Sequence, residues 1–176
     1  MVRLNPKMAK IYRYVGPPDI LHFDTLPERF LITAPPDVSR WIRETHQERG
    51  GDGGFIATFV INTMGELWIA DRHSEHVHCA RNGDVLSAGE ITFALEKGTV
   101  SVLAVTNQST GFCPEPVSWT AVQTALDAIG FDAPDDFTTP FDFRRCPTCG
   151  AVNIVKEGHL VCNVCENDLP ALWNFG

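Results

Sequence analysis

Hydrophobic residues alternate with other residues through much of the segment 55–105, a period typical of β-strands. Phe55, Ala57, Phe59 and Ile61 would share one face of a strand, and the residues between them are largely apolar as well. Similar apolar runs cover residues 66–71, 90–95 and 100–105, with turn residues at 63–65 and 96–98. This pattern predicts a β-meander. A shorter run at 11–15 predicts a further strand, and one at 30–33 predicts either a strand or the entry to the next helix.

The segment that begins at residue 35 has the helical period instead. Val38, Trp41, Ile42 and Thr45 lie at i, i+3, i+4 and i+7, so they form one buried stripe. We expect a helix from 35 to about 49, ended by the glycines at 50 and 51. The loop at 50–54 is rich in glycine, but it precedes a strand and lacks the Lys-Ser/Thr pair of a phosphate-binding loop.

A second helix is predicted after the last strand. Ser118 is its expected N-cap and Gly130 its stop. Its expected buried face consists of apolar residues at helical spacing: Val122, Ala125, Leu126 and Ile129. The predicted fold class is therefore α+β, a mostly antiparallel sheet with two helices, followed by a small C-terminal zinc ribbon.

Two domains are expected within the 176 residues. Residues 132–140 are rich in Pro, Asp and Thr, which is typical of a linker with little regular structure. We place an α+β domain at 1–140 and the ribbon, with an apolar tail, at 141–176. Residues 141–143 are expected to return to the main sheet, and the tail around Trp173 is expected to pack on the ribbon or at the junction.

The ribbon rests on two Cys-x-x-Cys pairs, Cys146 with Cys149 and Cys162 with Cys165. This spacing is typical of a closed, tetrahedral Zn²⁺ site with four thiolate ligands. Gly150 is expected in the left-handed conformation after the first pair, and Asn167 in the same role after the second. Residues 151–161 are expected to form a hairpin that turns at 157–158 and brings the pairs together.

Other uses of the four cysteines are two disulfides, a redox dithiol or a rubredoxin-like iron site. The N-terminus has no apolar signal sequence, so we expect a reducing, cytoplasmic setting in which stable disulfides are disfavoured. A single redox dithiol would not need the second pair. A small ribbon cannot build a sufficient core alone, so a structural Zn²⁺ is the preferred interpretation. His159 would be a fifth candidate ligand or a solvated strand residue.

The net charge of −8 argues against non-specific binding to nucleic acid, which depends on neutralising phosphates. The ribbon itself has no basic face. Its three cationic residues are outnumbered by Asp142, Glu157, Glu166 and Asp168. We therefore expect a protein partner rather than nucleic acid, and no membrane span, because no apolar run reaches 18 residues. The sequence also allows a small-molecule substrate.

A second unusual stretch, 71–79, holds three of the six histidines. His73 and Glu75 are a candidate general acid/base pair, because imidazole titrates near neutrality and a carboxylate can orient it. If the stretch were extended, His76 and His78 would share one face. A second metal site formed by these three histidines, or an ordinary polar loop, are the alternatives.

Cys113 lies in a loop between the last strand and the second helix, a common place for a functional site. It would act as a nucleophile only if a base lay nearby, and the histidines of 73–78 are the candidates. The alternative is a buried, inert thiol.

Four short motifs carry a resemblance over residues 54–132. They are Gly65-Glu-Leu-Trp68, His73-Ser74, Ala88-Gly89-Glu90, and Ser109 with Pro114. Their order resembles a domain of plant IQM-type calmodulin-binding proteins and bacterial effector-like proteins. In this chain, Gly111 and Phe112 replace the His and Tyr of that domain's last motif. The resemblance implies that His73-Ser74, Glu90 and residues 107–112 lie in one loop region of an α+β domain.

Two functions are therefore weighed. The first is a zinc-binding module whose ribbon serves stability or protein–protein interaction. The alternative is a toxin- or effector-like enzyme acting on a nucleotide or protein. Its cleft would be lined by six candidate residues: His73, Glu75, His76, Glu90, Asn107 and Cys113.

Overall fold

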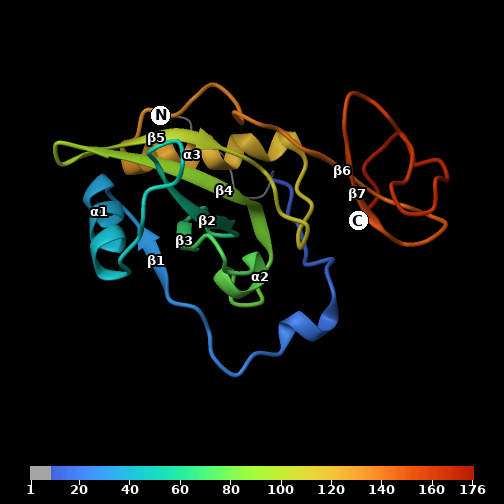
Figure 1. Ribbon diagram of the computed structural model, residues 1–176, viewed down its shortest axis with the longest axis horizontal. Helices are drawn as coiled ribbons and strands as arrows, with labels where there is room; N and C mark the ends of the chain where they lie inside the picture. Colours follow the sequence, from blue (N-terminus) through green and yellow to red (C-terminus); the bar gives the residue numbers. More distant parts are fainter. Residues whose placement is uncertain (1–8) are drawn as a thin grey trace.

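The computed structural model describes residues 9–176. Its main sheet is antiparallel throughout, with the strand order β1-β3-β2-β4-β5 (Figure 1). The strands are β1 (Arg29–Ile32), β2 (Phe55–Asn62), β3 (Leu67–Asp71), β4 (Val85–Glu96) and β5 (Thr99–Val105). Together with the helices, this arrangement confirms the predicted α+β class.

The prediction of a β-meander was wrong, because β4 pairs with β2 and not with β3. Both faces of β2 are largely apolar, and six of its eight residues are buried. Such a strand is most stable at the centre of a sheet, with a neighbour on each edge. The chain therefore crosses back after β3, and residues 76–79 form the short helix α2 (His76–Cys79) on the way.

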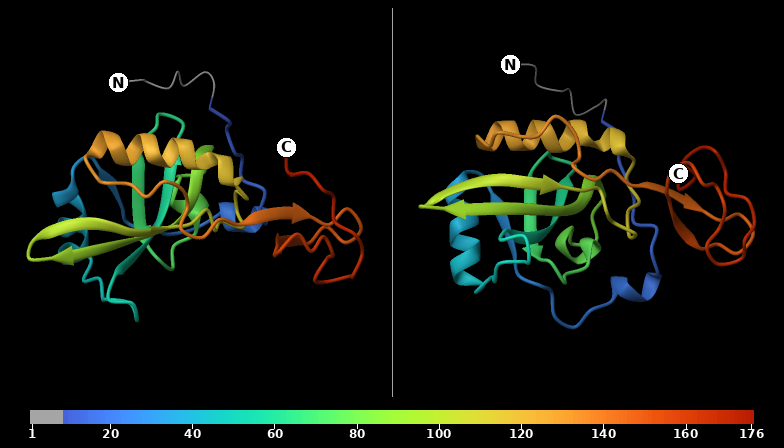
Figure 2. Two further views of the ribbon diagram at one scale, coloured as in Figure 1. Left: turned by 90° about the horizontal axis from the view of Figure 1, so that it is seen from above. Right: turned by 45° about the horizontal axis from the view of Figure 1, so that its top comes forward.

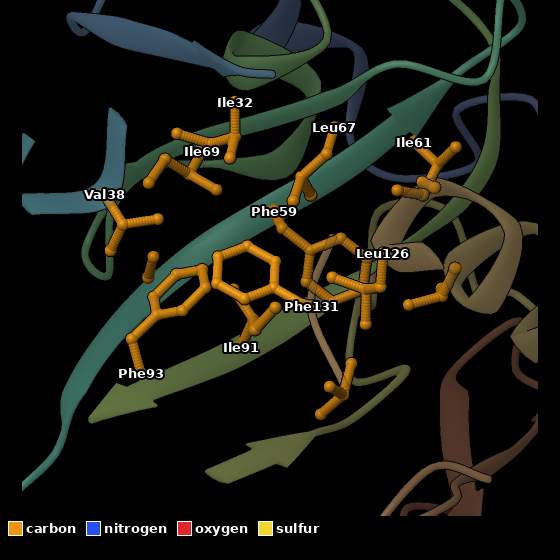
Figure 3. Close-up of a cluster of buried hydrophobic side chains, with 14 of the residues drawn as sticks. Ile32, Val38, Phe59, Ile61, Leu67, Ile69, Ile91, Phe93, Leu126 and Phe131 are labelled. Atoms are coloured by element: carbon orange, nitrogen blue, oxygen red, sulfur yellow. The ribbon is translucent and has the colours of Figure 1, made fainter. Parts of the chain in front are cut away.

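The larger core lies on the face of the sheet that α1 (Pro35–Glu44) and α3 (Trp119–Ile129) cover (Figure 2). Trp41 of α1 and Leu126 of α3 contribute to it from the helices. Figure 3 shows Phe59, Phe93 and Phe131 packed together with Leu126 at its centre. The buried stripes predicted for the two helices are confirmed at all positions except Thr45 and Ile129, which are only partly buried.

A smaller core covers the opposite face. It contains Val60 and Ala88 from the sheet, Val77 and Cys79 from α2, and Phe112 from the loop after β5. The N-terminal segment closes this side through Tyr12, which forms one bridge with Val85 instead of the strand expected at 11–15. The 3₁₀ turn η1 (Pro18–Leu21) follows it. The apolar character of both faces of β2 thus reflects burial on both sides.

Helix α1 ends at Glu44, about one turn before the predicted boundary. His46 has a φ of 54° and the Gln47 amide donates a hydrogen bond to the Ile42 carbonyl at 2.9 Å. This is a Schellman-type C-terminus, in which the residue after the C-cap takes the left-handed conformation. Glycine is favoured there, so His46 is strained in this conformation. The helix thus ends at this turn, before the glycines at 50–51.

Replacing His46 with Gly is therefore expected to stabilise the protein by about 1 kcal/mol, because it relieves this backbone strain. The expected rise in the thermal midpoint is about 2–4 °C. Differential scanning calorimetry would measure it, with His22→Gly as the control at an exposed position whose φ of −104° is ordinary. A lower midpoint for the His46 variant would contradict this account.

The side chain of Ser118 does not cap α3, contrary to the prediction. Its hydroxyl lies 2.9 Å from the hydroxyl of Ser87 on β4, and no side-chain cap bond is present at this helix end. Ser118 is the last residue of the turn η2 (Pro116–Ser118), which leads directly into the helix, so its backbone is already helical. Gly130 ends the helix in the left-handed conformation, as expected.

The C-terminal part forms its own two-stranded sheet, at the end of the molecule away from α1 (Figure 1). Strand β6 (Asp142–Arg145) pairs with β7 (Val152–Val155), so the prediction that 141–143 return to the main sheet was wrong. The turn at Glu157-Gly158 exists, but β7 pairs with β6 rather than with the residues after the turn. The first knuckle, between β6 and β7, is itself the tight connection that a hairpin needs.

The C-terminal tail joins the ribbon to the main domain, as expected. The Trp173 indole donates a hydrogen bond of 2.7 Å to the carbonyl of Cys113, and its ring packs edge-to-face on Tyr12. The guanidinium of Arg145 donates to the carbonyl of Val15 at 2.9 Å. Across residues 9–176, no helix has both the length and the apolar character needed to cross a membrane.

Candidate functional site

The four ribbon cysteines converge on one point. Their sulfur atoms all lie within 4.8 Å of one another, and this is the one cluster in the described part of the chain that could hold a metal ion. The Sγ atoms of Cys146 and Cys165 are 3.5 Å apart, and those of Cys149 and Cys162 are 3.6 Å apart. A tetrahedron with metal–sulfur bonds of about 2.3 Å requires sulfur–sulfur distances of roughly 3.8 Å. The residues present therefore fit a four-thiolate site.

The two knuckles have the same backbone design. The Gly150 amide donates to the Cys146 carbonyl at 2.9 Å, and the Glu166 amide donates to the Cys162 carbonyl at 3.0 Å. Gly150 has the expected left-handed conformation, with a φ of 78°. In the second knuckle, Glu166 has this conformation (φ 63°), not Asn167 as predicted. The position four residues after the first cysteine of each pair makes the turn, and Glu166 occupies it in the second pair.

Hydrogen bonds from protein amides to the sulfurs of Cys162 and Cys165 favour the thiolate form that a metal requires. The amide of Val164 and the side-chain amide of Asn153 both donate to Cys162 Sγ at 3.4 Å. Backbone hydrogen bonding at Cys165 and Val164 lowers the pKa of Cys162 to about 6. The side-chain amide of Asn167, 3.3 Å from Cys165 Sγ, lowers the pKa of Cys165.

Sequence reasoning missed Asn153. Its side chain is buried, donates to Cys162 Sγ and accepts a hydrogen bond from the Asn163 amide at 2.8 Å. The signal was a single amide within the apolar run Val-Asn-Ile-Val, which needs buried partners. His159 is exposed and does not belong to the cysteine cluster.

The three histidines of 73–78 do not converge. His76 Nε2 lies 2.9 Å from the Gly89 carbonyl, and burial lowers the pKa of this imidazole. His78 Nε2 lies 2.6 Å from the Ile20 carbonyl, and its ring packs on Phe23. His73 is exposed. The stretch is not extended: residues 72–75 form a turn, and the helical turn that follows carries His76 and His78, whose rings contact different carbonyls.

Cys113 and Asn107 are both engaged by the surrounding chain. Burial raises the pKa of the Cys113 thiol to about 12, although Arg145 acts in the opposite direction. Asn107 is fully buried and its amide nitrogen donates to the carbonyls of Pro114 and Phe141, both at 2.8 Å. Its amide oxygen accepts from the Phe141 amide at 2.7 Å. Asn107 thus fixes the start of the ribbon.

The other residues of the proposed cleft lie on neighbouring segments. Glu90 is half-buried on β4 and pairs with Thr58, whose hydroxyl donates to the carbonyl of Ser74 at 3.2 Å. Thr106 also contacts Glu90, since its amide donates to the Glu90 carbonyl at 2.9 Å. The exposed Glu75 raises the pKa of Tyr14, after the larger effect of burial.

The loop at 73–78 and the loop at 107–113 line different cavities. His73 borders a polar cavity of about 310 Å³ with residues 45–50 and Asp71. Thr110 borders a cavity of about 500 Å³ beside the ribbon. The glycine-rich loop uses its amides internally, for example Gly50 to the Gly54 carbonyl at 2.7 Å. A catalytic cleft joining the two loops stays a prediction.

Comparisons of the chain with protein-family models, with curated proteins and with solved structures find no match in any of the three. The resemblance to the IQM-type and effector-like domain therefore stays a prediction.

Proposed function

We propose that this protein is a zinc-binding module whose metal builds the C-terminal ribbon, and that the ribbon serves protein–protein interaction. The observation that carries this proposal is the closed set of four cysteine sulfurs, all directed at one point. Four protein ligands leave no open position for a reacting water, which is typical of structural sites. When bound, zinc would cross-link the two knuckles and would not take part in a reaction.

The packing of the ribbon supports a structural role. Its buried cluster contains only Cys146, Cys162 and Leu169, so two of its three buried members are themselves candidate ligands. Apolar burial on this scale cannot offset the conformational entropy of ordering some thirty residues. Binding of a structural Zn²⁺ contributes about 10–16 kcal/mol in small zinc domains, which is sufficient.

The state of the other candidate residues supports binding rather than catalysis. His76, Asn107 and Cys113 use their polar groups in hydrogen bonds that hold segments of the chain together. A catalytic group needs to reach a substrate, and these groups reach carbonyls of the protein itself. The ribbon, in contrast, presents an accessible surface, with the side chain of Val164 71% exposed.

Metal analysis of the purified protein tests the first half of the proposal. We expect one zinc per chain by elemental analysis, and native mass spectrometry is expected to show one bound ion that strong chelators remove together with the release of four reactive thiols. A chain that carries iron instead, or four thiols that react without metal release, would contradict the zinc assignment. Reduced, metal-free protein reloaded with zinc serves as the control.

A further inference from the structure

The two edges of the ribbon sheet differ. The tail covers the outer edge of β6, where the Asn174 side chain accepts from the Arg145 amide at 2.8 Å and donates to the Arg145 carbonyl at 2.8 Å. Strand β7 pairs only with β6, and no further strand adjoins its outer edge within residues 9–176. Edge strands with unsatisfied backbone groups are templates for pairing with another chain.

The register identifies the backbone groups on this edge. In an antiparallel pair, residues alternate between those that bond to the opposite strand and those that point away from it. The backbone amide and carbonyl of Arg145 bond to Asn174 and not to Val152, the residue opposite. Arg145 and Val152 are therefore a pair whose backbone groups point away from each other. Cys146, the next residue, donates to the Ala151 carbonyl at 2.8 Å, as the alternation requires. The outward residues of β7 are therefore Val152 and Ile154.

A cavity of about 500 Å³ lies beside this edge. Val152 and Ile154 line it together with Val161 and Val164 of the second knuckle, and Thr110 of the main domain borders it. Lys156 adds a positive charge to the lining, and His159 adds a polar ring. Lys156 forms no ion pair within the part of the chain that the structure describes.

We propose that the outer edge of β7 binds an extended, acidic segment of a partner protein as an added strand. The partner's backbone pairs with the amide and carbonyl groups of Val152 and Ile154, which is the β-augmentation mode of peptide recognition. Its alternate apolar side chains enter the cavity, and a carboxylate faces Lys156. This inference rests on the proposed function, because the second knuckle, which the metal would hold in place, contributes Val161 and Val164 to the lining of the cavity.

Charge favours such a peptide over a second copy of this chain. Pairing of two β7 edges would bring together two molecules that each carry a net charge of −8. That self-repulsion opposes association of whole chains. A short segment with one carboxylate placed at Lys156 avoids most of this repulsion, because the rest of the segment carries little charge.

Selection from a random heptapeptide phage library on the zinc-loaded full chain tests the proposal. We expect enrichment of peptides with alternating apolar residues and at least one acidic residue. Synthetic copies of them are expected to bind the Ile154→Pro variant about tenfold more weakly, the effect of losing about one hydrogen bond. Proline removes only an outward-facing amide there, and it is tolerated on an edge strand. Ile154→Thr, which keeps the amide, is the matched control.

Zinc content and sedimentation are measured on the same samples. Absence of enriched peptides, equal binding to the proline variant, or dimerisation through β7 would each overturn the proposed peptide site. In all three cases one zinc per chain would leave the metal assignment standing. A Lys156→Glu variant gives a second, independent readout, because its selected peptides are expected to exchange acidic residues for basic ones.

Discussion

Replacing Cys162 with Ser is expected to abolish metal binding and unfold the ribbon while the main sheet persists. The ribbon has almost no apolar core of its own, whereas the five-stranded sheet is buried on both faces. Loss of one of four ligands removes most of the metal's contribution of about 10–16 kcal/mol. Hydrogen exchange with mass spectrometry would show lost protection over residues 142–169 and retained protection over 55–105.

Cys79→Ala is the matched control for this variant. Cys79 is a buried thiol outside the cluster of four cysteines, and its Sγ atom lies 3.7 Å from the carbonyl of Trp68. Its removal costs some packing energy but should leave one metal per chain and a protected ribbon. Loss of protection over the whole chain in the Cys162 variant would contradict separate folding of the two parts, which the predicted boundary at residue 140 implies.

Replacing Asn107 with Ala is expected to destabilise the protein by about 3–5 kcal/mol, since one buried and two partly buried backbone groups lose their partners and each costs about 1–3 kcal/mol. Those groups are the Pro114 carbonyl and both the amide and carbonyl of Phe141. Denaturant unfolding followed by circular dichroism would measure the loss. It would also decide between two roles, because a residue used only for catalysis could be removed with little effect on stability.

Gln108→Ala, at the adjacent exposed position, provides the comparison. It is expected to change the free energy of unfolding by less than about 0.5 kcal/mol. A stable Asn107 variant, with its unfolding midpoint unchanged, would return this residue to the list of candidate catalytic groups.

Local patterns predicted the elements well, and long-range pairing limited the rest. The strands of the main sheet and both long helices follow from period and turn residues, since these depend on neighbours in sequence. The position of β4 beside β2 does not, because it depends on which faces are buried by α2 and the N-terminal segment. The apolar residues on both faces of β2 indicated burial on both sides, but not which strands would be its neighbours.

The candidate sites show the same division. The spacing of the four cysteines specifies the cysteine cluster almost completely, since each knuckle is a local turn. Asn107 and His76 were predicted to line a catalytic cleft because they are polar residues in expected loops. Their hydrogen-bond partners, Phe141 and Gly89, lie 34 and 13 residues away and could not be read from the sequence.

The anchoring of the ribbon also has a consequence for the order of folding. Its entry is held by Asn107 and its exit by the carbonyl of Cys113, so both anchors belong to one loop of the main domain. A third contact, from Arg145 to Val15, spans 130 residues. Contacts of such long range form late, because the entropy of closing the chain must be met first. The ribbon can bind metal on its own local turns, but it docks only after the loop at 107–113 has reached its final form.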